Sequence, residues 1–341
     1  MVDKKRKIGR REFIALSLGL AVGGISTEFL TGKFIDYESN CVRVEDDRLY
    51  ALKANRSSTY QGYNIETNNL GMRDNRQLSF GKKPGTKRVL VIGDSHVMAH
   101  GVEMKDSFTH LLEERLNKRR DGSNYEVWPA GVCGYNARQE AAVLEHFKAC
   151  SPDIVVVCSV DNDICLPLYL HSDSVYQSAL LEIAGELWSK FNGSIHRKNW
   201  RGLINAPIDP ETKLPLQEFD PALVDEKYAS FVGPESMSSS YRMMVDSARK
   251  ACARPIFFVD YCNLDPKRED KGISPLEKEM NIWAKEAGFE VIDIAPGITR
   301  TMNEKKLDYK RDLCVSPNDP HANEMRHRMI AEQLYSYLIE H

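Results

Sequence analysis

One short stretch constrains the fold of this chain more than any other. Residues 89–92 form a continuous apolar run, Val-Leu-Val-Ile, which stops at Gly93-Asp94-Ser95. Such a run is typical of a strand that is buried on both faces of a parallel sheet. Open α/β sheets place their chemistry at the carboxyl ends of such strands, so the Ser95 hydroxyl is the first candidate nucleophile. If a helix begins near Ser95, its free N–H groups point at the group that this hydroxyl attacks.

Strands and helices alternate along the rest of the chain. Apolar runs that suit buried strands are separated by segments with helical periodicity. This alternation predicts a parallel sheet with helices on both faces. We expect strands at 88–93, 125–130, 154–160, 255–260 and 290–294, and helices at 106–120, 136–150, 275–287 and 322–339.

Two segments fall outside this alternation. Residues 36–85 are polar, and their turn-rich part at 66–74 is expected to pack near the site. Residues 165–250 are too long for one crossover helix and show no clean period. We therefore expect an insertion or a lid beside the carboxyl ends of the strands, and a partly ordered surface excursion is the alternative.

The N-terminus has the layout of an export signal. Residues 4–11 are mostly Lys and Arg, and residues 13–25 are almost wholly apolar. Residues 10–14, Arg-Arg-Glu-Phe-Ile, resemble a bacterial twin-arginine signal. The apolar run of about 13 residues is shorter than the roughly 20 that cross a bilayer as a helix. We expect residues 1–35 to be a signal or an N-terminal membrane anchor, which places the protein outside the cytoplasmic membrane; a cytoplasmic protein is the alternative.

Charge and cysteine spacing argue against several partners. A net charge of −3 gives no basis for nucleic-acid binding. The eight cysteines include no Cys-x-x-Cys pair, so we expect no metal site. No Gly-x-Gly-x-x-Gly follows a predicted strand, so we expect no dinucleotide cofactor.

Small or polar residues follow each of the first three predicted strands. Ser95 follows the first strand, Gly131 the second and Asn162 the third. The carboxyl ends of parallel strands meet at one edge, so these residues are expected to converge. A glycine lets a backbone N–H approach a ligand closely, and an Asn amide can donate to a developing oxyanion. Each residue alone is equally typical of a turn or a helix cap.

A candidate base precedes the last predicted helix. In Asp319-Pro320-His321, the proline keeps Asp319 extended, so its carboxylate can orient the imidazole. A neutral imidazole held by a carboxylate is the general base that a serine hydroxyl needs. An exposed histidine at a helix start is the alternative for His321, and His327, further along that helix, is a weaker candidate base.

In this order the blocks resemble those of the SGNH/GDSL hydrolase superfamily. Residues 93–95 resemble its first block, Gly131 its second, residues 162–163 its third, and Asp319 with His321 its last. Many members have Asp-x-x-His in the last block, where this chain has Asp-x-His.

Two further features bear on the resemblance. Residues 69–73, Asn-Leu-Gly-Met-Arg, are similar to the Asn-x-x-Gly-Phe-Arg lead-in of one bacterial branch. His96 stands after the candidate nucleophile, where an apolar residue is usual.

The resemblance implies a flavodoxin-like three-layer α/β/α sandwich over residues 86–341, with the insertion at about 165–250. It also implies ester hydrolysis without a metal or another cofactor. Ser95 would be the nucleophile, His321 the general base and Asp319 the residue that orients it. The oxyanion hole would use the backbone N–H groups of Ser95 and Gly131 and the side chain of Asn162.

Two side chains next to the blocks are candidates for substrate contact. They are His96 and Asp163, and the alternative for His96 and for His100 is a local pocket or surface histidine. The expected partner is an O-acetyl or short-chain ester on carbohydrate, because export brings envelope glycans within reach. Two alternatives remain: an acyltransferase that acts on a sugar hydroxyl, and a non-catalytic glycan-binding or assembly protein.

Overall fold

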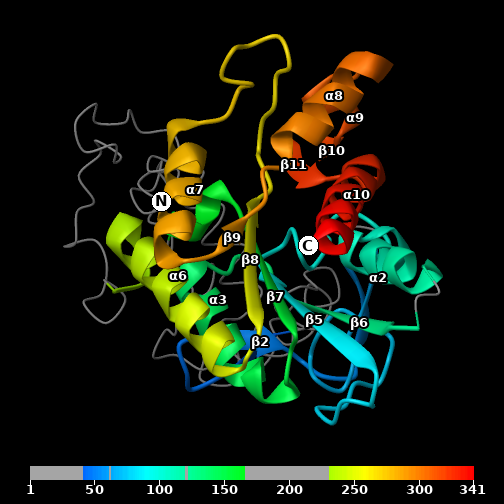
Figure 1. Cartoon of the computed structure of the whole chain (residues 1–341), viewed down its shortest axis with the longest axis vertical. Coiled ribbons are helices and arrows are strands. Elements are labelled where there is room, and N and C mark those ends of the chain that lie inside the picture. The colour runs from blue at the N-terminus through cyan, green and yellow to red at the C-terminus, as the bar shows by residue number, and fades with distance from the viewer. Residues whose placement is uncertain (1–40, 61–62, 120–121, 166–229) are drawn as a thin grey trace, which may run out of the picture. The chain divides into compact units, whose positions relative to one another are not determined.

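A five-stranded parallel sheet lies at the centre of the computed structural model, which describes residues 41–60, 63–119, 122–165 and 230–341 (Figure 1). The strand order is β6-β5-β7-β8-β9. Numbered along the chain this order is 2-1-3-4-5, the flavodoxin-like winding, whose switch point lies between β5 and β7. The strands are β5 (Thr86–Gly93), β6 (Asn124–Gly131), β7 (Ile154–Ser159), β8 (Arg254–Val259) and β9 (Glu290–Val291).

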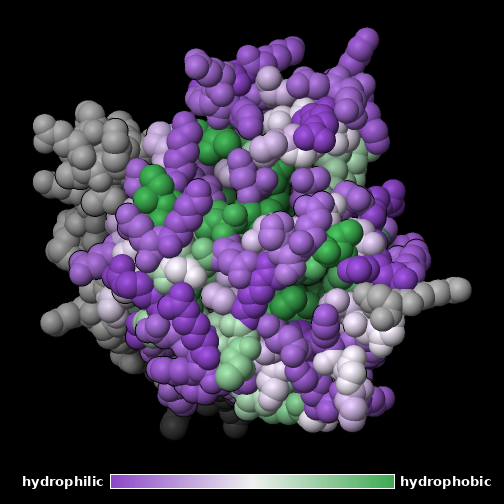
Figure 2. Space-filling view, viewed as in Figure 1, coloured by the Kyte–Doolittle hydropathy of each residue, from purple (hydrophilic) through white to green (hydrophobic). Residues whose placement is uncertain are grey.

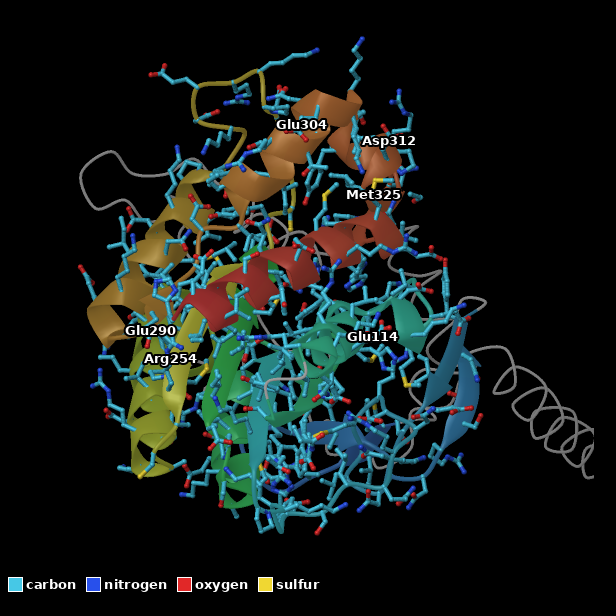
Figure 3. The ribbon with its side chains drawn as sticks, turned by 45° about the vertical axis from the view of Figure 1, so that its right-hand side comes forward. Glu114, Arg254, Glu290, Glu304, Asp312 and Met325 are labelled. Carbon is cyan, nitrogen blue, oxygen red and sulfur yellow. The ribbon has the colours of Figure 1, made fainter. Side chains whose placement is uncertain are left out.

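Helices cover both faces of this sheet, so the predicted α/β/α class is confirmed. One face carries α2 (Phe108–Lys118) and α10 (Glu324–Glu340), and Figure 3 shows α10 crossing in front of the strands. The other face carries α3 (Ala137–Phe147), α6 (Gly233–Lys250) and α7 (Pro275–Ala287). Shorter elements are η2 (Met104–Asp106), η3 (Lys148–Cys150), η4 (Asp161–Ile164), α8 (Ala295–Lys305) and α9 (Tyr309–Asp312).

Three antiparallel hairpins stand outside the main sheet. They pair β1 (Cys41–Arg43) with β2 (Tyr50–Leu52), β3 (Ser57–Tyr60) with β4 (Tyr63–Glu66), and β10 (Cys314–Ser316) with β11 (Asp319–Ala322). In Figure 1 the β10–β11 hairpin, α8 and the long loop after β8 lie on the same side of the sheet.

The three central strands are apolar without interruption because both of their faces are covered. Residues 89–92 of β5, 155–158 of β7 and 256–259 of β8 have no exposed surface. The surface is different in character. In Figure 2 hydrophilic residues cover most of the visible face, and hydrophobic residues appear there in separate patches.

Most predicted elements are confirmed within two or three residues, and α7 has the bounds expected for it. The helix considered at Ser95 does not form, and residues 94–101 form a bend and consecutive turns instead. The last strand ends at Val291, and α8, which was not expected, follows soon after it.

The bounds expected for the insertion, about 165–250, are wrong in their last part. That part forms α6, which is the crossover helix between β7 and β8. Serines along α6 hide its helical period in the sequence, although its buried residues do follow one: Met237, Tyr241, Met244, Val245 and Ala248. Residues 166–229 lie outside the described residues, as does the export-type segment. Within the described ranges, no helix has both the length and the apolar character needed to span a membrane.

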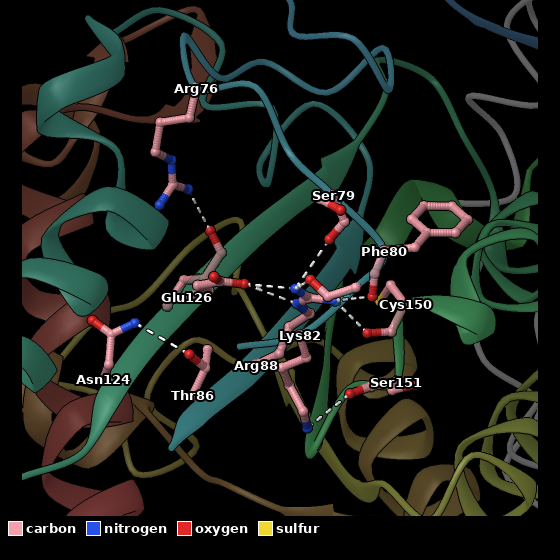
Figure 4. Close-up of polar contacts among 12 residues, drawn as sticks. Arg76, Ser79, Phe80, Lys82, Thr86, Arg88, Asn124, Glu126, Cys150 and Ser151 are labelled. Atoms are coloured by element: carbon pink, nitrogen blue, oxygen red, sulfur yellow. Dashed lines mark hydrogen bonds and ion pairs between the residues drawn. The ribbon is translucent and has the colours of Figure 1, made fainter. Parts of the chain in front are cut away.

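A buried arginine fixes the amino end of the sheet (Figure 4). The Arg88 side chain is 1% exposed, and it pairs with Glu126 at 2.8 Å. It also donates to the backbone carbonyls of Phe80, at 3.0 Å, and of Cys150. Its guanidinium lies 4.1 Å from the centroid of the Trp128 ring. These contacts tie the segment before β5 to the end of the sheet that lies opposite Ser95.

The sheet edge formed by β8 and β9 is closed by a pair of opposite charges. Arg254 of β8 pairs with Glu290 of β9 at 2.5 Å, and Figure 3 labels both side chains. Both are partly exposed, so we expect this contact to add little to the free energy of unfolding.

A buried histidine joins α10 to α2. His327 Nδ1 accepts a hydrogen bond of 3.2 Å from the backbone N–H of Phe108, the first residue of α2. The two rings also stack, with centroids 5.8 Å apart. Burial lowers the pKa of His327 from 6.5 to about 3, so the ring is neutral at pH 7 and Nδ1 can accept.

This contact predicts acid sensitivity. Between pH 6.5 and about 3 the unfolded chain binds a proton at His327 that the folded chain does not. The free energy of unfolding should therefore fall as the pH is lowered through this window, by up to about 1.4 kcal/mol per pH unit from this group. His327→Asn keeps an acceptor but cannot titrate, so urea unfolding from pH 7 to pH 4 should show a shallower fall. The exposed His110 on α2 gives a control in His110→Asn. An equal fall in the wild type and in His327→Asn would contradict the prediction.

Candidate active site

The turn after β5 holds Ser95 at the switch point of the sheet. Hydrogen bonds shape it: Met98 N–H donates to the Asp94 carbonyl at 3.0 Å, and His100 N–H donates to the Ser95 carbonyl at 2.9 Å. The Asp94 side chain accepts from the His96 N–H at 2.9 Å. Ser95 is 6% exposed, so its hydroxyl lies just below the surface.

Gly131, at the end of β6, lies directly against this turn. A Cβ at this position would lie 2.5 Å from Met98 N and 2.8 Å from the Asp94 carbonyl oxygen. Real Cβ atoms do not approach other atoms so closely, so any other residue would displace the turn that carries Ser95. The glycine therefore has a packing reason that the sequence did not indicate.

The segment before the sheet supports the same turn, which confirms that it packs near the site. Arg73 is 4% exposed. Its Nη1 donates to the carbonyls of Met98, at 2.9 Å, and Ala99, at 2.5 Å, and its Nη2 donates to Val102 at 2.8 Å. A single side chain thus holds three backbone carbonyls of the loop after Ser95.

The β11 strand brings a histidine and a carboxylate to Ser95. His321 Nε2 lies 2.8 Å from Ser95 Oγ, and His321 Nδ1 lies 2.5 Å from Asp319 Oδ1. Residues two apart on a strand point to the same side, so the Asp-x-His spacing suits a strand. Ser95 and His321 are 226 residues apart in the sequence, and the fold brings them into hydrogen-bond contact.

The charges around His321 are set by its neighbours. The hydrogen bond from His321 holds the pKa of Asp319 well below its usual range, so this carboxylate is ionised at neutral pH. A second histidine, His100, has its ring centroid 4.3 Å from that of His321. Burial lowers the pKa of His100 to about 4. His100 is therefore neutral at pH 7.

Asn162 also reaches the site. It lies in η4, directly after β7, and its Nδ2 donates to Asp94 Oδ2 at 3.2 Å. Ser95 Oγ lies 3.2 Å from the same oxygen. The amide and the hydroxyl are thus held next to each other by one carboxylate.

Asp163 does not face the site, so its expected contact with substrate is wrong. Its side chain is buried, and Oδ2 accepts from Ser159 Oγ at 2.5 Å and from the Val160 N–H at 2.9 Å. Burial raises the pKa of this carboxyl group. Its contacts fix the turn that starts η4.

His96 belongs to a buried cluster that the sequence analysis did not find. His96 Nδ1 lies 2.7 Å from Asp260 Oδ2, and Arg326 Nη2 donates to the same oxygen at 2.8 Å. Arg326 Nη1 donates to the Pro320 carbonyl at 2.9 Å, between Asp319 and His321. We call His96, Asp260 and Arg326 the buried clamp, because it joins the Ser95 turn, the end of β8 and β11.

The buried clamp is charged. Burial alone would raise the pKa of Asp260, but the charge of Arg326 and the hydrogen bond from His96 hold that pKa well below its usual range. Burial would lower the pKa of His96, but the hydrogen bond to Asp260 and the charges of Asp94 and Asp260 together outweigh it and raise that pKa. His96 therefore uses Nδ1 inside the protein, and its ring centroid lies 5.0 Å from that of His321.

One group of described residues has the spacing of metal ligands. The ligand atoms of His100, Asp319 and His321 lie within 4.8 Å of one another. His321 also contacts Ser95, and Asp319 contacts His321, so serine chemistry and metal binding would use the same side chains.

Comparisons with known proteins find similar solved structures at low sequence identity. No protein-family model matches the chain, and no curated protein matches it. Similar solved structures include the acetyl xylan esterase AlAXEase, at 16% identity and a TM-score of 0.42, over 74% of this chain and 99% of that one. A variant of Axe2, an acetylxylan esterase from Geobacillus stearothermophilus, has 13% identity and a TM-score of 0.43, over 73% and 93%.

A third structure comes from Desulfitobacterium hafniense DCB-2 and is described as a lipolytic protein of the G-D-S-L family. It has 14% identity and a TM-score of 0.41, over 73% of this chain and 98% of that one. At these identities the function has to be argued from the geometry of the site.

The buried clamp predicts an unequal response to two substitutions. Arg326→Met leaves the Asp260 charge buried without its arginine, which should lower the free energy of unfolding by about 3–5 kcal/mol. Adding Asp260→Asn removes that charge, so the double variant should be more stable than Arg326→Met in urea unfolding at pH 7.

Arg88 and Glu126 provide the matched control. Glu126 is 25% exposed and can be hydrated once Arg88 is lost. Glu126→Gln should therefore restore little stability to Arg88→Met. If the double variant loses as much free energy of unfolding as the two single variants together, the charge of Asp260 is not left uncompensated in Arg326→Met.

Proposed function

We propose that the protein is a serine esterase of the SGNH/GDSL type, which hydrolyses short O-acyl esters on carbohydrate. The observation that carries the proposal is the series Ser95 Oγ, His321 Nε2, His321 Nδ1 and Asp319 Oδ1, joined by contacts of 2.8 and 2.5 Å. A hydroxyl, an imidazole and a carboxylate in this series can activate the hydroxyl for attack on an ester.

The first half of the reaction forms an acyl-enzyme. His321 Nε2 takes the proton of Ser95 Oγ while this oxygen attacks the carbonyl carbon of the ester. Asp319 keeps the Nδ1 proton in place and stabilises the imidazolium. As the tetrahedral intermediate collapses, His321 gives its proton to the leaving alcohol oxygen, and the acyl group stays on Ser95.

Water completes the reaction. His321 takes a proton from a water molecule, whose oxygen attacks the acyl carbon. Collapse returns a proton to Ser95 Oγ and releases the carboxylic acid. The negative charge on the intermediate would be stabilised by the Asn162 amide and by the N–H groups of Ser95 and Gly131. The 3.2 Å contact of Asn162 with Asp94 supports the first of these, because it holds the amide beside the hydroxyl.

The carbohydrate part of the proposal has separate support. The N-terminal export-type sequence would bring the enzyme to envelope or extracellular glycans.

Ser95→Ala tests the nucleophile. It should reduce kcat on nitrophenyl acetate and on acetylated polysaccharide by about 10⁴-fold or more, because the covalent intermediate can no longer form. Urea unfolding should stay close to that of the wild type. A fluorophosphonate should label one site in the wild type and none in the variant. Full turnover by the variant would rule out the mechanism, and acylated acceptor in place of free acid among the wild-type products would identify a transferase.

Asn162→Ala tests the oxyanion hole. Loss of one donor should lower kcat by about 10²–10³ with little change in KM, because the donor acts on charge that develops in the transition state. The control is Asn64→Ala, since Asn64 is exposed on β4. Equal kcat values for Asn162→Ala and the control would remove Asn162 from the oxyanion hole.

A further inference from the structure

We propose that His100, Asp319 and His321 form a binding site for a transition-metal dication, for which Zn²⁺ is the best probe, and that a bound ion switches Ser95 off. The binding site itself needs no esterase activity. The inhibitory effect rests on the proposed function.

The geometry suits zinc. Tetrahedral zinc has bonds of about 2.0–2.1 Å to nitrogen and oxygen, which places ligand atoms about 3.3–3.4 Å apart. His100 Nε2 and Asp319 Oδ2 lie 3.6 Å apart. His321 Nδ1 lies 2.5 Å from the other carboxylate oxygen, Asp319 Oδ1. One ligand atom from each of the three residues lies within 4.8 Å of the others, so shifts of up to about 1.5 Å would complete the set. Two imidazoles and one carboxylate are a common zinc ligand set, and a fourth position is left for water.

The site is accessible on one side and rigid on the other. The side chains of His321 and Asp319 are 24% and 26% exposed, so an ion can reach them from solvent. His100 is 7% exposed, and its backbone N–H donates to the Ser95 carbonyl. Arg73 holds the preceding carbonyl, that of Ala99, at 2.5 Å. A ligand on such a fixed turn loses little freedom when it binds an ion.

The ligand type sets which ions bind. Imidazole nitrogens favour zinc and its neighbours such as cobalt, nickel and copper, whereas magnesium and calcium prefer oxygen ligands. We therefore expect Zn²⁺ and Co²⁺ to bind and Mg²⁺ to be inert at equal concentration.

Binding would reverse the role of His321. In the serine mechanism Nδ1 carries the proton and faces Asp319, while Nε2 has a lone pair for the Ser95 proton. A metal ion needs the lone pair of Nδ1, so the Nδ1 proton must leave and a proton from solvent is taken up at Nε2. Nε2 then becomes a donor toward Ser95 Oγ, which lies 2.8 Å away. The imidazole can no longer accept the hydroxyl proton, and the serine stays unreactive.

The first experiment measures binding. The full chain is dialysed against EDTA and then against metal-free buffer, and it is titrated with zinc chloride in a calorimeter. His100→Asn should weaken the binding by at least about tenfold, because loss of even a partner behind a ligand costs this much. Ser95→Ala should bind zinc like the wild type. His146→Asn, on α3, is the matched control and should bind unchanged.

The second experiment measures rate. Zinc should inhibit ester turnover with a half-saturation equal to its Kd, and EDTA should restore the rate. For His100→Asn, inhibition is measured relative to the variant's own metal-free rate and should need at least about tenfold more zinc. Equal zinc affinity in the wild type and His100→Asn would overturn the inference. Turnover that requires zinc would overturn both the inference and the proposed function. If the wild type binds zinc but has no ester turnover, and His100→Asn loses the binding, the metal site stands and only the proposed function is rejected.

Discussion

The contact between Ser95 and His321 depends on an ionic interaction buried behind it. Arg326 and Asp260 are both almost fully buried, and their pair is 2.8 Å long. Desolvating two charges costs several kcal/mol, which a single ion pair recovers only with further hydrogen bonds. Here Arg326 adds the Pro320 carbonyl and Asp260 adds His96, so the further bonds go to the two segments that carry the catalytic candidates.

The pairing in this clamp is incomplete. Asp260 Oδ1 and Arg326 Nε have no hydrogen-bond partner among the described residues. A buried cluster selected for stability alone would be better replaced by apolar side chains of similar volume. The clamp is better explained by geometry, because it links β11 to the Ser95 turn through the rigid end of β8. A shift of about 1 Å between nucleophile and base is enough to cost 10²-fold in rate.

Arg88 has the same kinds of contact at the amino end of the sheet, opposite Ser95. Both arginines pair with a carboxylate, donate to backbone carbonyls and lie over an aromatic ring, Trp128 for Arg88 and Tyr309 for Arg326. Arg88 fixes the segment that enters β5, and Arg326 fixes the segment that approaches its other end. Carbonyls of irregular segments need donors, and one guanidinium supplies several in a fixed geometry.

The sequence predicted the parts of the site that depend on local pattern. Ser95 and Asn162 follow buried strands, and strand ends converge in any parallel sheet. The contact between Asp319 and His321 could be predicted because it requires only an extended backbone between them. By contrast, Asp260 follows β8 in the same way and was overlooked, since nothing local distinguishes a buried aspartate from a turn residue.

Other parts could not be predicted. Arg326 lies on a helix, where a charged side chain is normally exposed, and its burial depends on contacts with segments distant in the sequence. No helix begins at Ser95, because Arg73 and Gly131 hold the turn at 94–101 in another conformation. The helical period of α6 was masked by serines, two of which, Ser236 and Ser240, are buried together with its apolar residues.

The position of His100 follows from that same turn, and it ties the two chemistries of the site together. In an α-helix starting at Ser95, the side chain of His100 would lie more than one turn further along and would point away from that of Ser95. The observed succession of turns places the His100 ring 4.3 Å from that of His321. β11 presents Asp319 and His321 on one side because residues two apart on a strand share a face, and this arrangement suits both the triad and the proposed metal site. What separates them is which nitrogen of His321 carries the proton, so the serine and a metal ion would compete through a single imidazole.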